Sequence, residues 1–287
     1  MIAIMKKELR AYFTQMIGYN VLVLMVLLTG LFFALLNVMP RSPNFHIVLS
    51  NFLVFLILVV PIITMRLFAE ESRNRTDQLL FTSPLTVTQI VLGKYLAASL
   101  LFSAAMGVTM LFPLMLSQYG ELPTNQIIGA YVGFILMGMA LIALGLFISV
   151  MTDNQITAAV FTFGAVFVVF LMDAIAGAMP TDTISSLVFV ALLVLAVAGI
   201  WYNSTKHIKS AIILAAAGIV VIVALYFFNN LIFDGVIVRF LRWISLFSRY
   251  HNLTRGVLNL SDIVYYVTFG MMFIYFTINV IEKRRWR

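Results

Sequence analysis

Long apolar runs separated by short polar intervals dominate the chain. A helix rises about 1.5 Å per residue, so about 20 apolar residues cross the hydrocarbon core of a bilayer. No internal repeat or low-complexity linker interrupts the pattern, so we expect one membrane domain over residues 1–287, an all-α integral membrane protein. Eight segments are long enough to span: residues 18–38, 47–68, 94–117, 126–150, 156–178, 184–202, 210–228 and 262–281.

The first segment, residues 1–17, has the pattern of an amphipathic helix. Apolar residues recur at helical spacing from Ile2 to Met16, and basic residues occupy the other side. We expect this helix to lie along the inner membrane surface, with Lys6, Lys7 and Arg10 toward anionic headgroups. A solvated helix of a cytosolic tail is the alternative interpretation.

A second amphipathic stretch covers residues 229–261, before the last predicted span. Its basic residues Arg239, Arg242 and Arg249 fall on one helical face, and apolar residues face elsewhere. A ninth span is disfavoured, because each arginine would cost a few kcal/mol at bilayer depth. We therefore expect one or two helices at the outer interface, with these arginines facing that interface.

Composition supports a membrane protein and removes several kinds of chemistry. The chain is 63% hydrophobic and 10% charged, with a mean hydropathy of +1.07, whereas soluble domains are about 25% charged. It has no cysteine, which excludes disulfides and thiol catalysis. The lysines and arginines lie at predicted helix ends without a continuous basic face, which argues against a nucleic-acid partner.

The distribution of basic residues predicts the orientation. With the N-terminus in the cytoplasm, 13 of the 18 basic residues fall on the inner side, which is the side that Lys and Arg favour. An even number of spans places both termini in the cytoplasm. The first apolar run is long enough to span and no small-residue cleavage pattern follows, so we expect no cleaved signal peptide.

The sequence lacks the signatures of an enzyme or a metal protein. Thr88 stands where a G-x-x-x-x-G-K phosphate-binding loop ending at Gly93-Lys94 would need its first glycine, so we expect no ATP hydrolysis by this chain alone. The three histidines are far apart and form no ligand spacing. We therefore predict no catalytic residue, no metal site and no cofactor in the chain. Asp173, near the outer end of its span, is the one ionisable residue within a predicted span.

The longest charged interval, residues 66–94, separates the second and third predicted spans. Ser83-Pro84 offers a helix start and Thr86-x-x-Gln89 an alternative capping box, so we expect a short helix around 84–92. Leu79 and Leu80 are apolar residues ringed by charges, a pattern typical of protein docking sites. The alternative is that these leucines lie on the membrane surface. A chain without an ATP site or coupling carboxylates, yet with this large interval, indicates a partner that supplies energy.

These residues resemble the membrane subunit of type-2 ABC transporters, and within that group the gliding-motility permease type. The resemblance rests on three stretches of the chain and covers most of its length. They are Lys-Lys-Glu-Leu-Arg-Ala-Tyr-Phe at 6–13 with Gly18-Tyr19, Glu70-Glu71-x-Arg73-x-x-Thr76-Asp77-x-Leu79-Leu80-x-x-x-Pro84 with Gly93-Lys94-Tyr95, and Arg255-Gly256-Val257 with Ser261-Asp262-x-x-Tyr265.

The resemblance implies a bacterial plasma-membrane permease, an exporter, whose ATP and Mg are bound by a separate ATP-binding subunit. It implies a coupling helix within residues 69–93, a second permease subunit, identical or not, and in some cases an accessory extracytoplasmic subunit. The usual family count is six spans, so the pair around 184–228 is an addition. Carried over residue by residue, the ATPase-docking residues are Glu70, Glu71, Arg73, Thr76, Leu79, Leu80 and Pro84.

Two other functions remain open from the sequence. A secondary, ion-coupled transporter or channel needs buried charges within the membrane, for which Asp173 is the one candidate. A membrane enzyme acting on lipid needs clustered polar groups near one interface, which the distant histidines do not provide. The sequence does not identify a cargo: lipids, polysaccharides, peptides and drugs all remain candidates.

Overall fold

The computed structural model describes residues 1–76, 85–228, 233–257 and 259–285, and every regular element among them is a helix. These residues form two compact units. We call residues 1–170 and 246–287 the bundle unit, and residues 171–245 the hairpin unit.

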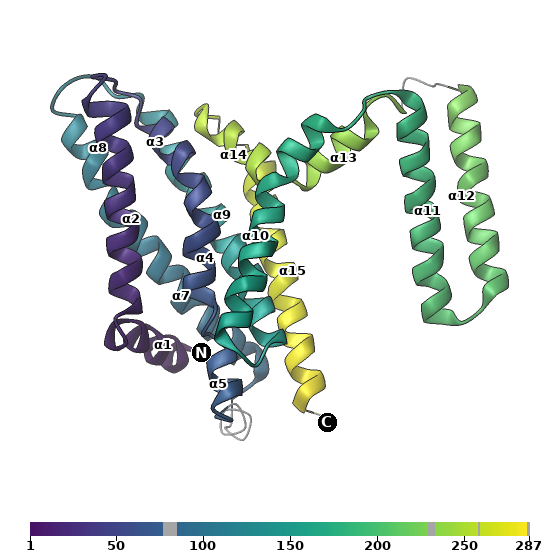
Figure 1. Cartoon of the computed structure of the whole chain (residues 1–287), viewed down its shortest axis with the longest axis horizontal. Helices are drawn as coiled ribbons and strands as arrows, with labels where there is room; N and C mark the ends of the chain where they lie inside the picture. Colours follow the sequence, from purple (N-terminus) through teal and green to yellow (C-terminus); the bar gives the residue numbers. More distant parts are fainter. Residues whose placement is uncertain (77–84, 229–232, 258, 286–287) are drawn as a thin grey trace. The chain divides into compact units, whose positions relative to one another are not determined.

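The bundle unit contains the interfacial helix and most of the predicted spans (Figure 1). The second span is broken into α3, η2 and α4, with Pro61 inside α4. The elements are α1 (Ile2–Thr14), α2 (Ile17–Phe33), η1 (Ala34–Val38), α3 (Phe45–Phe52), η2 (Leu53–Phe55), α4 (Leu56–Thr64), α5 (Ala69–Arg73), α7 (Val87–Thr109), α8 (Leu111–Leu116), α9 (Thr124–Met151), the first part of α10 (Gln155–Ala178), α14 (Leu246–Thr254) and α15 (Leu260–Arg285).

Helix α9 is the centre of the bundle unit. In its apolar 18-residue stretch 67% of the residues are buried, whereas 17% are buried in the corresponding stretch of α15. Small residues let its neighbours approach closely, as is common between membrane helices. A Cβ on Gly138 would lie 2.1 Å from the ring of Phe102, and one on Gly145 would lie 2.4 Å from Thr64 Oγ1. The positions of α7 and α4 therefore depend on these two glycines.

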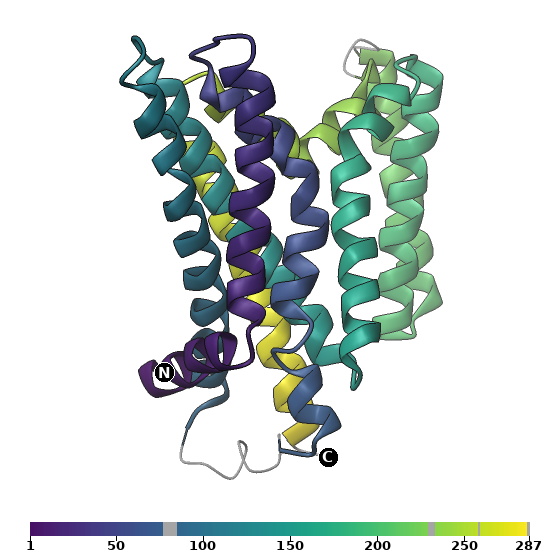
Figure 2. The ribbon, with the colours of Figure 1, turned by 60° about the vertical axis from the view of Figure 1, so that its left-hand side comes forward.

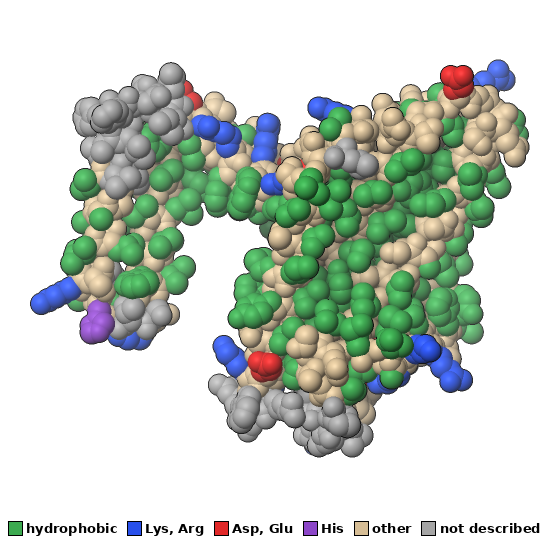
Figure 3. Space-filling model, turned by 180° about the vertical axis from the view of Figure 1, so that it is seen from behind, with side chains coloured by type: hydrophobic (Ala, Val, Ile, Leu, Met, Phe, Trp, Pro, Cys, Tyr) green, Lys and Arg blue, Asp and Glu red, His purple; other side chains and the backbone are tan. Residues whose placement is uncertain are grey.

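Helix α1 lies across the foot of α2 in both ribbon views (Figures 1 and 2). The same end of the bundle unit holds α5 and the last turns of α15, and we call it the α1 end. The opposite end holds α8, η1 and α14, and we call it the α8 end. In Figure 3, hydrophobic side chains cover the middle of the bundle unit and basic side chains lie toward its two ends, which is the pattern of a membrane-embedded surface.

The hairpin unit contains α11 (Thr183–Thr205), α12 (Ile208–Phe228) and α13 (Val236–Ile244). Asp182 caps α11 by accepting a hydrogen bond from the backbone N–H of Ser185 at 3.0 Å. Lys206, in the left-handed conformation, ends α11 before α12 begins. The backbone N–H of Gly235 donates to the carbonyl of Thr181 at 3.0 Å, so the chain closes on itself at the base of the hairpin. This hairpin is the additional pair of helices predicted around 184–228.

The structure confirms an all-α membrane protein of about eight spans. Seven described helices are long and apolar enough to cross a membrane, and α12 adds an apolar stretch over Ile208–Val220. The seven are Ile17–Val38, Phe45–Arg73, Val87–Leu116, Thr124–Met151, Gln155–Ala178, Thr183–Asn203 and Leu260–Arg284.

The predicted short helix around 84–92 is wrong in its extent. Thr86 accepts from the backbone N–H of Gln89 and forms the capping box, so the helix begins at Val87. It then continues without a break to Thr109, because the following residues are apolar helix formers of the third span. The alternative start at Ser83-Pro84 lies outside the described residues.

Candidate functional site at the α1 end of the bundle

A buried lysine joins three elements at the α1 end. Lys94, on the second turn of α7, is 1% exposed. Its Nζ lies 2.9 Å from Glu8 Oε1 of α1 and 2.9 Å from Glu71 Oε1 of α5. It also donates to the carbonyl of Leu67 at 2.6 Å and lies 5.0 Å from the ring centroid of Phe68. One ammonium group therefore holds α1, α5 and α7 together.

A second buried cation lies in the segment between α4 and α5. Arg66, 5% exposed, pairs with Glu70 at 3.6 Å and donates to the side chain of Gln15. Its guanidinium lies 5.0 Å from the ring centroid of Tyr12, within cation–π range. The segment that leads from α4 into α5 is thereby held against the C-terminal part of α1.

Six charged residues form the ion pairs here, and we call them the ion cluster: Lys7, Glu8, Glu71 and Lys94 are joined to one another, and Arg66 pairs separately with Glu70. The buried Lys94 has two carboxylates at 2.9 Å and a carbonyl at 2.6 Å, and such pairing with hydrogen bonds offsets the cost of burying its charge. Lys7 is the most exposed member at 60% of its side chain, and it donates to Glu71 at 3.2 Å. The cluster fixes the geometry at the place where the charged interval leaves the bundle unit.

Tyr12 adds an uncharged tie between α1 and α4. Its hydroxyl donates to the carbonyl of Ile63 at 2.7 Å, and the side chain is fully buried. Burial raises the pKa of the Tyr12 phenol, so the hydroxyl stays protonated and remains a donor. This hydrogen bond requires the backbone carbonyl of Ile63 in α4 to face α1.

Close backbone contact packs α1 against α7. A Cβ on Gly93 would lie 2.9 Å from Ile4 Cβ and 3.1 Å from the carbonyl oxygen of Met1. Only a residue without a side chain leaves room for this approach. The glycine and Lys94 are neighbours, so close packing and the ion pair support each other at one point of α7.

The tip of α5 carries exposed polar residues outside the ion cluster. Arg73, Arg75 and Thr76 are exposed, and Arg75 adopts a left-handed backbone conformation with φ of 56°. Ser72 donates to Asp153 Oδ1 at 2.5 Å, which ties α5 to the turn between α9 and α10. The described chain thus offers a basic surface at the tip of α5, on a segment held at its base.

The predicted ATPase-docking residues separate into three groups. Glu70 and Glu71 lie in the ion cluster, paired with Arg66 and Lys94 within the chain. Arg73 and Thr76 are exposed at the tip of α5. The remaining three, Leu79, Leu80 and Pro84, lie outside the described residues.

The basic residues predicted to lie at the inner membrane interface are on the outside of α1. Lys6, Lys7 and Arg10 are exposed, and the helix buries Ile4, Glu8 and Tyr12. The buried face therefore includes an acidic residue, whereas the sequence pattern suggested a purely apolar one. Ile2, assigned to the apolar face, is 61% exposed.

Sequence reasoning missed Glu8 as a site residue and treated Lys94 as one loop charge among several. One signal was present: Glu8 lies four residues from both Ile4 and Tyr12, on the same helical face. An acidic residue on a helix otherwise rich in lysine and arginine needs a cation elsewhere in the chain. Its partner, 86 positions later in the sequence, was not identifiable from spacing.

At the α8 end, Arg249 differs from the other two predicted interfacial arginines. Arg239 and Arg242 are exposed on α13. Arg249, on α14, forms an ion pair with Asp262 Oδ1 at 3.1 Å and stacks on the ring of Tyr265 with its Cζ 4.0 Å from the centroid. This pair, 16% and 4% exposed, fastens α14 to the start of α15.

Metal chemistry finds no support within the residues that the structure describes, where no three His, Cys, Asp or Glu side chains gather into a possible ligand set. What the α1 end offers is mechanical: an exposed charged tip whose base is tied to three helices. A force applied to α5 would reach α1 and α7 through the ion pairs of Glu71 and Lys94.

Comparison with known proteins places the chain in a family. Residues 37–227, more than half of the sequence, match a family model described as ABC-2 family transporter protein. The match covers the elements from the end of η1 to α12. Neither the curated proteins nor the solved structures contain a match.

Proposed function

Because the chain belongs to the ABC-2 family of transporter proteins, and thus is the transmembrane component of an ABC transporter, we propose that a separate ATP-binding subunit drives it by docking at the α1 end. The transporter works as an exporter. ATP and Mg are bound and hydrolysed by the partner, not by this chain. The docking surface is the tip of α5 with the residues that follow it up to Thr86.

The observation that carries this proposal is the ion cluster behind the docking surface. A docking segment transmits motion only if its base is stiff, and buried ion pairs with several hydrogen bonds are costly to break. Lys94 connects α5 directly to α7 and α1. A displacement of α5 by the ATPase therefore moves the end of the second span and the start of the third together.

Charge at the α5 tip supports a protein partner. Arg73 and Arg75 are exposed beyond the ion cluster. Exposed charges of one sign at an interface rim steer association and fix the register of docking. The partner surface that fits them is acidic, with apolar pockets for the leucines at positions 79 and 80.

The proposed orientation places the α1 end in the cytoplasm of a bacterial cell, with both termini on that side. The basic residues of α1, Lys6 and Arg10, are exposed there and suit contact with anionic headgroups. Two copies of the permease, or this chain and a similar one, complete the transporter around a central path. No observation specifically favours a secondary transporter. That mechanism needs buried charges within the membrane, and its one candidate, Asp173, is partly exposed on α10.

Affinity purification from native membranes tests the proposal. Reversing two exposed charges, Arg73→Glu with Arg75→Glu, reduces the co-purified ATPase at least about tenfold, since interface hot spots cost about 2 kcal/mol or more. Leu79→Asp with Leu80→Asp has the same effect. The matched control is Arg239→Glu with Arg242→Glu, two exposed charges on α13, which leaves the ATPase bound.

Two results would overturn the docking assignment. One is an unchanged yield of ATPase with both α5-tip variants inserted in the membrane. The other is a preparation of the wild-type chain that contains no ATP-binding subunit at all, which would favour ion-coupled transport and make Asp173→Asn the next variant.

A further inference from the structure

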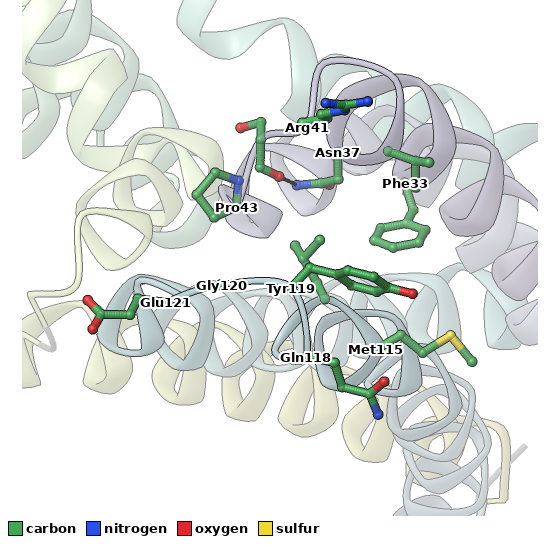
Figure 4. A pocket seen from close by; sticks show the side chains of 12 residues that line it. Phe33, Asn37, Arg41, Pro43, Met115, Gln118, Tyr119, Gly120 and Glu121 are labelled. Atoms are coloured by element: carbon green, nitrogen blue, oxygen red, sulfur yellow. Dashed lines mark hydrogen bonds between the residues drawn. The ribbon is translucent and has the colours of Figure 1, made fainter.

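Two features of the bundle unit lie outside the ATPase-docking surface. One is a cavity of about 860 Å³ at the α8 end (Figure 4). Arg41 and Glu121 belong to its lining, but their charged groups point away from the cavity, so the two charges do not meet there to select a ligand. The other feature is Ser149, a buried serine in the last turn of α9, whose hydroxyl contacts the chain between α4 and α5.

The turn between α4 and α5 takes a hydrogen-bond acceptor from outside its own segment. Helix α4 ends at Thr64 and α5 begins at Ala69, with residues 65–68 in the turn between them. The first N–H groups of a helix have no partner within that helix. A serine, threonine, asparagine or aspartate just before the helix usually accepts from them. Phe68 occupies that position here and makes no side-chain cap.

Ser149 supplies the missing acceptor from α9. Its Oγ accepts the backbone N–H of Phe68 at 3.1 Å and that of Ala69 at 3.2 Å. The same hydroxyl donates to the carbonyl of Met65, the residue that caps the end of α4, at 3.4 Å. A hydroxyl has one hydrogen and two lone pairs, so these three bonds use its full capacity. One side chain of α9 therefore serves both the end of α4 and the start of α5.

These hydrogen bonds are closed to water. Ser149 and Ala69 are fully buried, and Phe68 is 8% exposed. A buried N–H without an acceptor is costly, because no water replaces the lost partner. Removing the Ser149 hydroxyl would leave two N–H groups in that state, so the turn would have to rearrange and the direction of α5 would change with it.

Close packing along one face of α9 lets so short a side chain reach the turn. Gly145 lies one helical turn before Ser149, and a Cβ on it would lie 2.4 Å from Thr64 Oγ1. Asp153, four residues after Ser149, accepts a hydrogen bond from Ser72 of α5 at 2.5 Å. Positions 145, 149 and 153 thus contact the end of α4, the turn and α5 in succession.

From these contacts we propose that Ser149 is a positioning residue for the ATPase-docking segment: it sets the direction of α5 against α9, so that the two helices move as one body when the ATPase acts on α5. Helix α5 has five residues, too few to hold a direction by itself. Helix α9 packs on α4, α7, α14 and α15, so its movement reaches most of the bundle unit. The role in transport rests on the proposed function, whereas the position of α5 can be tested without the ATPase.

Two spin labels measure the position of α5 in the purified protein. The chain has no cysteine, so Asn74→Cys and Ile128→Cys, both at exposed positions, place one label at the end of α5 and one on α9. We expect one narrow distance distribution from pulsed electron paramagnetic resonance. Ser149→Ala broadens it about twofold, because α5 then samples more than one direction. Ser149→Thr keeps the hydroxyl and keeps the narrow distribution.

The matched control is Ser99→Ala, which removes another buried serine hydroxyl, on α7 and away from the turn, and leaves the distribution unchanged. Ser149→Ala removes a single oxygen atom, and the contacts of Tyr12 and Lys94 remain, so this variant folds. A cooperative thermal transition verifies the fold of each variant.

The complex with the ATPase tests the role in transport. Ser149→Ala leaves every proposed docking residue in place, so the ATPase still co-purifies. Trapping the wild-type complex with ATP and vanadate leaves the distance between the labels at 74 and 128 unchanged, because α5 and α9 move together. In Ser149→Ala the same treatment changes that distance, because α5 moves without α9. A substitution that only lowered stability would not produce a nucleotide-dependent change.

Three results would overturn the assignment. They are a distribution as narrow in Ser149→Ala as in the wild type, equal broadening by Ser149→Ala and Ser99→Ala, and a Ser149→Ala complex whose label distance stays fixed on trapping. Absence of the ATPase from every preparation would contradict the proposed function alone, since the label distances of the isolated protein still decide whether Ser149 positions α5.

Discussion

Lys94 shows what a single residue contributes at the α1 end. The sequence places it at the end of the charged interval 66–94, where a solvated lysine is the ordinary expectation. In the fold it is buried among two carboxylates and a carbonyl. Its role could not be predicted from the sequence, because the partners lie on segments 23 and 86 positions away and only tertiary packing brings them together. The residue types predicted that this segment is charged, but they did not predict which carboxylates pair with Lys94.

Replacing Lys94 by methionine keeps most of the volume and removes the charge. Glu8 and Glu71 then lose their buried cation and keep only the exposed Lys7 as a partner. We therefore expect the free energy of unfolding to fall by about 3–5 kcal/mol. Denaturant titration of the detergent-purified protein, followed by circular dichroism, measures this change.

Lys7→Met is the control for the same substitution at an exposed position. Its side chain is 60% exposed, and surface ion pairs contribute about 0–1 kcal/mol, so this variant stays near the wild type. Adding Glu8→Gln and Glu71→Gln to Lys94→Met restores part of the loss. Equal stability of the two methionine variants would show that Lys94 is not the hub of the ion cluster.

At the scale of elements, amphipathic patterns predicted that helices exist but not which face each one buries. Residues 2–14 form the expected helix, yet its buried face runs through Ile4, Glu8 and Tyr12. Residues 229–261, where one or two helices were expected, contain α13 and α14, and Arg249 pairs with Asp262 on the inward side of α14. In both cases the inward-facing side includes a charged residue with a distant ion-pair partner, which hydrophobic periodicity does not detect.

Packing of α1 on α7 can be tested by adding one methyl group. Gly93→Ala places a Cβ 2.9 Å from Ile4 Cβ, so we expect α1 to move away and its amide protection in hydrogen exchange to fall about tenfold. Gly107→Ala, on the same helix, has no atom within 4 Å of the new Cβ. That control gains helix propensity, about 1 kcal/mol, and leaves α1 protected. Identical exchange of α1 in the two variants would contradict the close approach.

Across the whole molecule, the apolar runs of the sequence predicted the number and limits of the spans closely, since length and hydropathy decide whether a helix can cross a bilayer. They did not predict the division into two units. That division follows from the packing of the helices. In the apolar stretch of α9, 67% of the residues are buried, whereas 11% are buried in that of α11, which packs on α12 and α13. Sequence hydropathy is the same for both helices, at 2.6.

Excision of the hairpin tests the independence of the bundle unit. The carbonyl of Thr181 and the backbone N–H of Gly235 are 3.0 Å apart, so residues 182–234 can be replaced by a short Gly-Ser linker without stretching the chain. We expect the shortened protein to keep a cooperative thermal transition and to retain the ATPase in affinity purification. Loss of both, with normal membrane insertion, would show that the hairpin completes the fold of the bundle unit.

The contact between Thr181 and Gly235 also has an evolutionary consequence. A segment whose two ends meet can be gained or lost in a single genetic event without displacing the rest of the fold. Because the hairpin contains two helices, its gain would leave every later loop on its original side of the membrane.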